Sequence, residues 1–245
     1  RAPPGERRGG RPGGRRRLMS AWLPLSGVRV ADFSMFVPGP VCSAILADLG
    51  AEVIKIEPAK GDPGRGYVPV QFRTENRTKR SIAVDLKNPS SRKVIQRLAE
   101  QSDIAIEGFR PGVARRLGID GETLRAFNPK IVCCSITGTG PTGPYVKRPA
   151  YDTVGQGMGG MMSVLMDPKN PKPVGPAYAD CLSGMFSALG ILGALVSRNS
   201  TGKGQQVDAT MVGSILAFLA FQASLLVVYY VPLPFRAKLV YAILA

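Results

Sequence analysis

The sequence predicts an α/β fold, in which a Rossmann-like parallel sheet carries helices on both of its faces. Short apolar runs alternate with helical patterns along the chain. Each run is apolar throughout, as expected for strands that are covered on both sides in a parallel sheet. The chain has 245 residues, of which 44% are hydrophobic, and this is enough for one large α/β domain with a buried core.

The pattern begins with a β-α-β unit. Residues 28–33 predict a short buried strand, residues 41–49 predict a helix that ends at Gly50, and residues 53–57 predict a second strand. The connection has the length that a crossover between parallel strands needs. Residues 58–69 follow as a loop rich in Gly and Pro.

Three more strands are predicted in the middle of the chain, at residues 81–86, 103–107 and 131–136. A helix from Asn88 to about Glu100 connects the first two, because apolar residues recur along one of its faces. A turn at residues 109–112 then leads into a short helix that holds Arg115 and Arg116. This continued alternation supports parallel strands joined by helices.

Residues 138–144 follow the fifth strand and contain the spacing G-x-G-x-x-G. This spacing is typical of dinucleotide-binding folds when it opens a helix in the first β-α unit. Here Pro141 and Pro144 cannot open such a helix, and the motif falls late in the chain, so we reject a dinucleotide site. The stretch either lines a ligand channel with backbone N–H groups or forms a plain surface loop.

The rest of the chain is organised around residues 174–190, where a Gly-Pro turn leads into Asp180 and a helical run of small and apolar residues. Gly184, Ala188 and Gly190 would allow this helix to approach another element closely. Asp180 has two interpretations at the start of the helix. It is either an N-cap for the first-turn N–H groups, or a nucleophile held ionised by the helix dipole.

Composition excludes several kinds of site. The chain has no histidine, which removes Ser-His catalysis, Cys-His catalysis and histidine metal sites. Its cysteines are Cys42, Cys133, Cys134 and Cys181, and they form no Cys-x-x-Cys motif. We therefore expect buried, reduced thiols in an intracellular compartment, and we predict no metal site.

The net charge of +15 is unevenly distributed. Residues 1–22 form a basic leader, rich in Arg, Gly and Pro, that we expect to be disordered. The leader is compatible with a transit peptide, with translated sequence ahead of a start at Met19, or with a nucleic-acid tail, although no aromatic residues interleave with its arginines. A cytoplasmic or mitochondrial location is therefore expected. The remaining basic residues suit a phosphorylated cofactor, and no nucleic-acid partner is predicted.

The last part of the chain begins with a predicted sixth strand at residues 205–211 and a helix from about Val212. Residues 215–231 carry no charge, and their length is near the lower limit for spanning a bilayer. Gln222 and Ser224 interrupt this run. A buried core helix is therefore preferred, and no membrane association is predicted.

From about Leu23 to about Ala223, the chain contains a series of short motifs that occur in the same order in a known protein family. They are PLSGVRVADF at 24–33, GP at 39–40, LADLGAEVIKIE at 46–57, KRSI at 79–82, DLK at 85–87, RPG at 110–112, SITG at 135–138, YD at 151–152, AD at 179–180 and TGKGQ at 201–205. Together they resemble the class III CoA-transferases, the family of formyl-CoA transferase and carnitine-CoA transferase.

The resemblance implies a CoA-transferase that moves CoA between an acyl-CoA and a carboxylic acid. Asp180 matches the family's nucleophile, which attacks the thioester to form a mixed anhydride and then an aspartyl-CoA thioester. The acceptor carboxylate takes over the carbonyl, and CoA finally captures the new acyl group. Asp152 replaces the family's Glu beside the nucleophile and keeps its charge. No permanently bound cofactor is implied, because CoA and acyl-CoA are substrates.

The resemblance also implies a CoA site, formed by Val84, Asp85, Leu86, Lys87, Gly108, Phe109, Arg110, Arg116, Thr137 and Gly138. Arg116 matches a CoA-binding arginine, and the others match segments that line the CoA site. Val37 stands where formyl-CoA transferase has a catalytic glutamine, and Pro58 stands where it has an arginine. Both differences argue against formyl-CoA and oxalate. Tyr151 replaces the histidine of related acyl-CoA racemases, which disfavours racemisation.

Family members continue through a smaller second domain and form interlocked homodimers, whereas this sequence no longer matches beyond about Leu225. We therefore expect residues 23–224 to form the N-terminal part of the large domain, truncated before the second domain, and residues 225–245 to form a divergent apolar tail. The homodimer is expected of the family rather than of this short chain. The alternative function is a truncated, non-catalytic fragment that binds CoA or only assembles.

Overall fold

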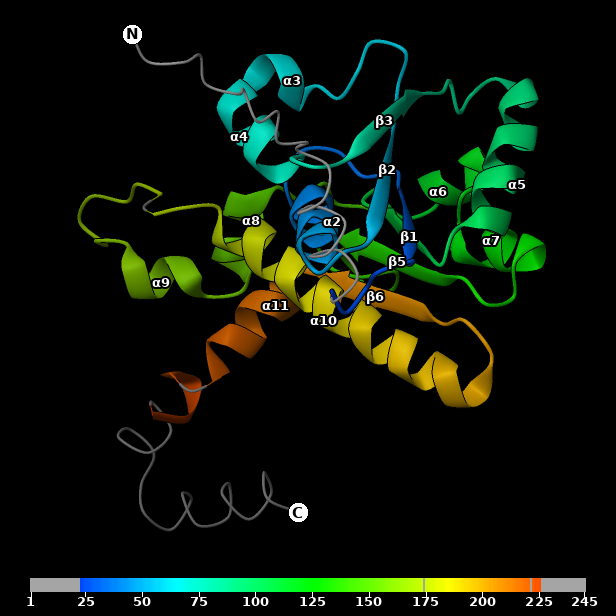
Figure 1. Ribbon diagram of the computed structural model, residues 1–245. Helices are drawn as coiled ribbons and strands as arrows, with labels where there is room; N and C mark the ends of the chain where they lie inside the picture. The colour runs from blue at the N-terminus through cyan, green and yellow to red at the C-terminus, as the bar shows by residue number, and fades with distance from the viewer. Residues whose placement is uncertain (1–22, 174, 221, 226–245) are drawn as a thin grey trace, which may run out of the picture.

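A six-stranded parallel sheet forms the centre of the computed structural model, which describes residues 23–173, 175–220 and 222–225 (Figure 1). The strands are β1 (Arg29–Asp32), β2 (Glu52–Glu57), β3 (Arg80–Ala83), β4 (Ile104–Glu107), β5 (Val132–Thr137) and β6 (Gln206–Thr210). Their order is β3-β2-β1-β4-β5-β6, and all neighbours are parallel. The predicted α/β class and all six predicted strands are confirmed.

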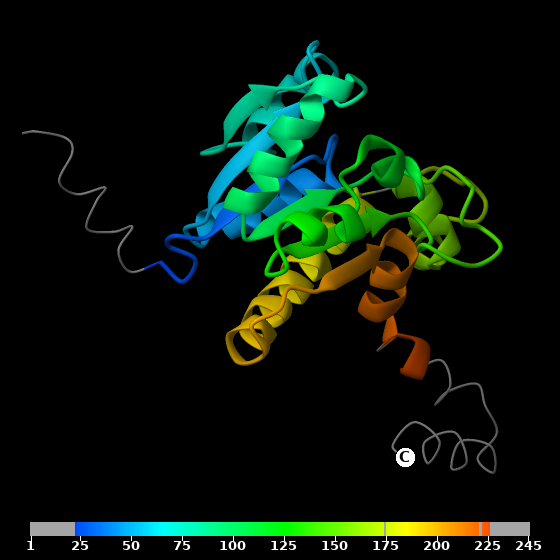
Figure 2. The ribbon, with the colours of Figure 1, turned by 90° about the vertical axis from the view of Figure 1, so that its right-hand side faces the viewer.

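Different helices cover the two faces of the sheet (Figure 2). On one face pack α2 (Pro38–Asp48) and α10 (Tyr178–Thr201), and on the other pack α5 (Arg92–Gln101), α6 (Val113–Leu117) and α7 (Gly121–Phe127). Along β4, Ile106 belongs to the core of the first face and Ala105 to the core of the second. Because successive side chains of a strand point to opposite faces, burial on both faces explains why the strands are apolar throughout.

A third group of helices packs beside α10. It contains α8 (Asp152–Met158), α9 (Met161–Leu165) and α11 (Met211–Phe218). A Cβ atom at Gly155 would lie 2.8 Å from the Ala179 side chain, and one at Gly159 would lie 2.4 Å from Ile215. The glycines of this segment are therefore required by the close packing of α8 against α10 and α11.

The prediction of a loop at residues 58–69 was wrong in part, because only residues 58–63 and Val68 lie outside helices. This stretch contains α3 (Gly64–Tyr67) and leads into α4 (Pro69–Glu75), neither of which was predicted. Pro69 occupies the first turn of α4, where a proline costs nothing because the N–H of that position has no intrahelical partner. Helix α7 was also missed, although Asp120 caps it by accepting from the N–H groups of Glu122 and Thr123.

The predicted leader and most of the predicted apolar tail lie outside the described residues. Of the uncharged run at residues 215–231, Ile215 and Leu219 are buried, whereas Leu216, Phe218 and Leu225 are exposed, so the described part supports the predicted buried core helix only in part. Helix α10 is long and apolar enough to cross a membrane on length and composition alone. Half of its most apolar window is buried in the molecule, which is also typical of the core helix of an α/β domain.

Candidate active site

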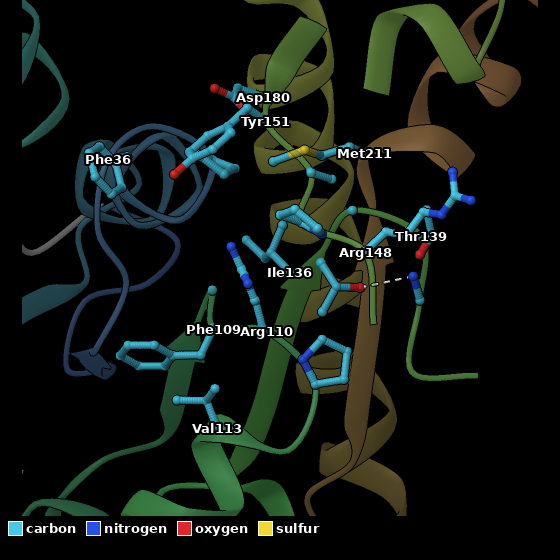
Figure 3. A pocket seen from close by; sticks show the side chains of 18 of the residues that line it. Phe36, Phe109, Arg110, Val113, Ile136, Thr139, Arg148, Tyr151, Asp180 and Met211 are labelled. Atoms are coloured by element: carbon cyan, nitrogen blue, oxygen red, sulfur yellow. Dashed lines mark hydrogen bonds between the residues drawn. The ribbon is translucent and has the colours of Figure 1, made fainter. Parts of the chain in front are cut away.

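A cavity of about 270 Å³ opens at the carboxyl ends of β1, β4 and β5 (Figure 3). The order of the strands reverses between β1 and β4, and ligands of open parallel sheets bind at such a switch point. The wall consists of Phe33, Met35, Phe36 and Pro38 after β1, residues 108–111 and Val113 after β4, residues 136–140 at the end of β5, Val146 and residues 148–151 before α8, and finally Asp180 and Met211.

The carboxylate of Asp180 lies on the wall of this cavity. Asp180 is the third residue of α10 and only 9% of it is exposed. Its Oδ1 atom is buried and has no hydrogen-bond partner among the described residues. Figure 3 shows Asp180 beside Tyr151 at one end of the cavity, with Phe109 and Val113 at the other. The carboxylate thus lies at the cavity, and its Oδ1 atom accepts no hydrogen bond from the described residues.

The N-cap interpretation of Asp180 was wrong. The N-cap residue of α10 is Ala177, which has no side-chain acceptor, and the helix begins two residues before Asp180. The first-turn N–H groups of Ala179 and Asp180 instead donate to Oδ1 of Asp152, at 2.8 and 3.3 Å. The cap of α10 is therefore the Asp152 side chain of α8. The sequence alone could not reveal this contact, because Asp152 and the start of α10 are far apart in the chain.

The electrostatic surroundings of Asp180 favour its neutral form. Burial, followed by the charges of Asp152 and Glu75, raises the pKa of Asp180 to about 7. The nucleophile interpretation predicts that the helix dipole holds this carboxylate ionised, but desolvation outweighs the dipole at this position. Glu75 lies on α4, a helix that was not predicted, and its effect on the pKa of Asp180 was therefore missed as well.

The predicted close approach of α10 to its neighbours is confirmed. A Cβ atom at Gly184 would lie 2.6 Å from the backbone oxygen of Pro38, in the first turn of α2. A Cβ atom at Gly190 would lie 2.7 Å from the side chain of Val207 in β6. These two contacts fix α10 against α2 and β6, and they place its N-terminus at the cavity.

The structure brings together about half of the predicted CoA-site residues. Gly108, Phe109, Arg110, Thr137 and Gly138 all line the cavity that contains Asp180. The glycine-rich loop after β5 thus lines a cavity, as one of its two interpretations predicted.

The other predicted residues lie outside the cavity wall. They are Val84, Asp85, Leu86, Lys87 and Arg116, together with Asp152. Residues 84–87 follow the edge strand β3, and Arg116 is exposed on α6. The Arg116 guanidinium lies 3.7 Å from where a Cβ atom of Gly112 would stand, so it remains close to the turn that follows β4.

Several residues of the cavity wall were missed, among them Phe36 and Arg148. Phe36 has a φ angle of +62°, which is rare for a bulky residue and is often found at functional sites. Arg148 stacks over the ring of Tyr145, with 4.8 Å between the guanidinium carbon and the ring centroid. No pattern in the sequence indicates the backbone conformation of Phe36. Arg148 lies three residues before the matched Tyr151-Asp152 motif, and that proximity was the available signal.

A second cavity, of about 330 Å³, is lined by basic residues of the kind that were expected to bind an anion. Its cationic side chains are Lys55, Arg65, Arg73, Arg77, Lys79 and Arg80. Five of the six form ion pairs with carboxylates, and Arg73 has no such partner in the described part of the chain. Most of these cationic side chains are therefore already paired with carboxylates of the protein itself.

The thiols agree in part with the prediction. Cys42, Cys133 and Cys134 are buried, whereas Cys181, which follows Asp180, is partly exposed. Burial raises the pKa of Cys133 and Cys134 to about 12, so both are protonated at neutral pH. Within the described ranges, no group of three or more Cys, Asp or Glu residues is arranged to hold a metal ion.

Residues 25–229 match the family model described as CoA-transferase family III. A succinate–glutarate CoA-transferase from Agrobacterium fabrum is 39% identical over 214 residues, which cover 81% of this chain and 54% of that protein. A succinyl-CoA–D-citramalate CoA-transferase from Chloroflexus aurantiacus is 37% identical over 205 residues, covering 80% of this chain and 51% of that protein. The chain spans about half the length of the curated relatives it matches.

Solved structures show the same likeness. The crystal structure of a CAIB/BAIF family protein from Brucella suis is 38% identical and superposes with a TM-score of 0.80. The superposition covers 84% of this chain and 58% of that chain. The parallel sheet and its surrounding helices are therefore shared with this protein.

Proposed function

Because this chain belongs to CoA-transferase family III, we propose that it transfers CoA from an acyl-CoA to a carboxylic acid with Asp180 as the nucleophile. The observation that carries the proposal is the position of the Asp180 carboxylate. It borders a cavity that also contains the residues 108–110 and 137–138 expected to hold CoA, and its Oδ1 atom is free of partners among the described residues.

In the proposed reaction, a carboxylate oxygen of Asp180 attacks the thioester carbonyl carbon, the C–S bond breaks, and CoA leaves as a thiolate. The thiolate attacks Cγ of Asp180 in the resulting mixed anhydride, which releases the first acid and forms an aspartyl-CoA thioester. The acceptor carboxylate then displaces the thiolate at Cγ. The thiolate finally attacks the carbonyl of the acceptor and regenerates Asp180. Each step exchanges a carboxylate and a thiolate, so no proton has to be supplied.

The raised pKa of Asp180 has a clear role in this scheme. A desolvated carboxylate is less stabilised by its surroundings, and it therefore reacts more readily once it is ionised. Ionisation must come first, so the first acylation is expected to accelerate as the pH rises through about 7. Backbone N–H groups of the loop after β5 are candidates to stabilise the oxyanion that forms during the attack.

We propose a dicarboxylic acid as one of the two acids. Two of the relatives are named for succinate, glutarate and citramalate. Arg110 extends into the cavity in Figure 3, and its side chain has no partner among the described residues. A guanidinium placed there can pair with the second carboxylate of a short diacid. The differences at Val37 and Pro58 argue against oxalate.

The mechanism is tested by trapping the acyl-enzyme. Incubation with succinyl-CoA followed by hydroxylamine should convert Asp180 into a hydroxamate, seen as a mass shift on its peptide. Asp180→Asn should lose the adduct and keep its fold, because an amide cannot form the anhydride. An adduct on another carboxylate would refute the assignment of Asp180. Binding of CoA without any adduct would favour the second function, a chain that binds CoA without transferring it.

A further inference from the structure

Both carboxylate oxygens of Asp152 are occupied by protein donors. Oδ1 accepts from the backbone N–H groups of Ala179 and Asp180, at 2.8 and 3.3 Å. Oδ2 accepts from Nε2 of Gln156 at 2.5 Å. Asp152 does not belong to the wall of the cavity that Asp180 lines. The carboxylate therefore faces the start of α10 rather than the cavity.

The buried side chain of Gln156 contacts both the Asp152 carboxylate and the turn before α10. It lies one turn after Asp152 on α8, so the two side chains are neighbours on one helix face. It is only 6% exposed, and its Nε2 atom also donates to the backbone oxygen of Pro176 at 3.3 Å. One amide group thus connects the Asp152 carboxylate to the turn that enters α10. A buried polar side chain with two such contacts has little freedom to move.

We propose that Gln156 is a positioning residue for the reaction: it fixes the Asp152 carboxylate on the first turn of α10, and this holds Asp180 in place at the cavity. Asp152 is then a positioning residue as well, and not a second catalytic group. The proposal rests on the function proposed above for Asp180. It follows from the missing cap at Ala177, because without Asp152 the N–H groups of Ala179 and Asp180 have no acceptor.

The arrangement also sets the charges that surround Asp180. The titratable groups that act on Asp180 are Asp152 on α8 and Glu75 on α4, and the charge of Asp180 contributes in turn to the raised pKa of the neighbouring Cys181 thiol, after burial. Since Gln156 determines where the charge of Asp152 lies, replacing Gln156 should change the titration of Asp180. A purely structural contribution of Gln156 would change stability alone.

The test uses Gln156→Met, which removes the donor and keeps the size of the side chain. In NMR spectra of the whole chain, the amide protons of Ala179 and Asp180 should shift upfield as their acceptor is lost. The titration midpoint of the Asp180 carboxyl carbon should change in the same variant. Trapping with succinyl-CoA and hydroxylamine should slow by about tenfold to a hundredfold, the effect expected of a displaced reacting group.

Gln156→Glu supplies a second variant. While the introduced carboxyl group is protonated it can still donate to Asp152, so the wild-type amide shifts should be present at low pH. Once that group ionises, two carboxylates face each other, and the shifts should be lost. Gln96→Met is a matched control, because Gln96 donates to Glu100 with the same one-turn spacing on α5, which covers the other face of the sheet. It should change neither the amide shifts nor the titration.

Two results would overturn the proposal. The first is a folded Gln156→Met or Gln156→Glu variant with wild-type amide shifts and Asp180 titration at every pH. The second is an Asp152→Asn variant that keeps the amide shifts, because its side-chain oxygen still caps α10, but loses all trapping; Asp152 would then be catalytic. If the wild type gives no adduct while the NMR results are as expected, the positioning of Asp180 is supported and the proposed function fails.

Discussion

Asp180→Asn should make the protein more stable, and the gain should grow with pH. The substitution replaces a carboxylate by an amide of nearly the same shape, at a position that is 9% exposed. Because Asp180 does not cap α10, no backbone hydrogen bond is lost. The main change is that a group whose charge is unfavourable in the folded state becomes permanently neutral.

The size of the effect follows from the pKa of Asp180. Burial, then Asp152, then Glu75, raises it to about 7 from an ordinary value of 3.8. The folded state thus favours the protonated acid. The stability that protonation contributes is fully present below about pH 4 and is lost as the pH rises through about 7. A difference of about 3 in pKa corresponds to about 4 kcal/mol at 1.36 kcal/mol for each pKa unit. The amide of the Asp180→Asn variant does not titrate, so the variant loses none of this stability over the same range.

The assay is chemical or thermal unfolding of both proteins at pH 4 and at pH 8. The free energy of unfolding of Asp180→Asn minus that of the wild type should increase by roughly 3–4 kcal/mol between these pH values, or roughly 6–15 °C in Tm for a chain of this size. Asp167→Asn, at an exposed carboxylate, controls for the loss of one charge. A difference that stays constant with pH, or that falls, would show that folding does not raise the pKa of Asp180 and would refute the reasoning.

Gly184→Ala should lower the free energy of unfolding by about 1–3 kcal/mol, because its new methyl group meets a backbone oxygen of α2. Gly193→Ala, in open space on the same helix, should instead raise it by up to about 1 kcal/mol, and equal effects of the two changes in thermal unfolding would contradict the packing described. Lys55→Met should cost roughly 3–5 kcal/mol in denaturant unfolding, because Asp62 is left buried and unpaired; a loss below about 1 kcal/mol would mean that Asp62 reaches solvent. Arg116→Ala should weaken CoA binding in calorimetry, by a factor that shrinks at high salt, and an unchanged Kd would remove Arg116 from the site.

The fold was largely predictable because strand burial leaves a strong pattern. Apolar runs at residues 28–33, 103–107 and 131–136 mark β1, β4 and β5, since these strands are covered on both faces. The missed helices α3, α4 and α7 are short and begin at prolines or glycines, which are also typical of loops. Pro69 at the start of α4 is compatible with a helix as well as with a turn, and the sequence does not decide between them.

The site residues that lie at the ends of strands were predictable from the sequence. Those that depend on contacts between helices far apart in the chain were not. Residues 108–110 and 137–138 lie at the ends of β4 and β5, so their meeting at one edge of the sheet follows from parallel strands. The capping of α10 by Asp152 and the influence of Glu75 on Asp180 depend on how α8 and α4 pack against it. Such packing has no local signature in the sequence.

The strand order also has a consequence for the order of events during synthesis. Strand β1 pairs with β2 and with β4, so the middle of the sheet cannot form around Val30 until Ile104 has emerged. Strand β5 remains an unpaired edge until β6 is made, and α10 is translated between the two. The helix that carries Asp180 can therefore dock fully only after residues 206–210 leave the ribosome. Many of the contacts join distant parts of the chain, which is typical of slow folding, and the unpaired edge of β5 is the surface that other chains would meet meanwhile.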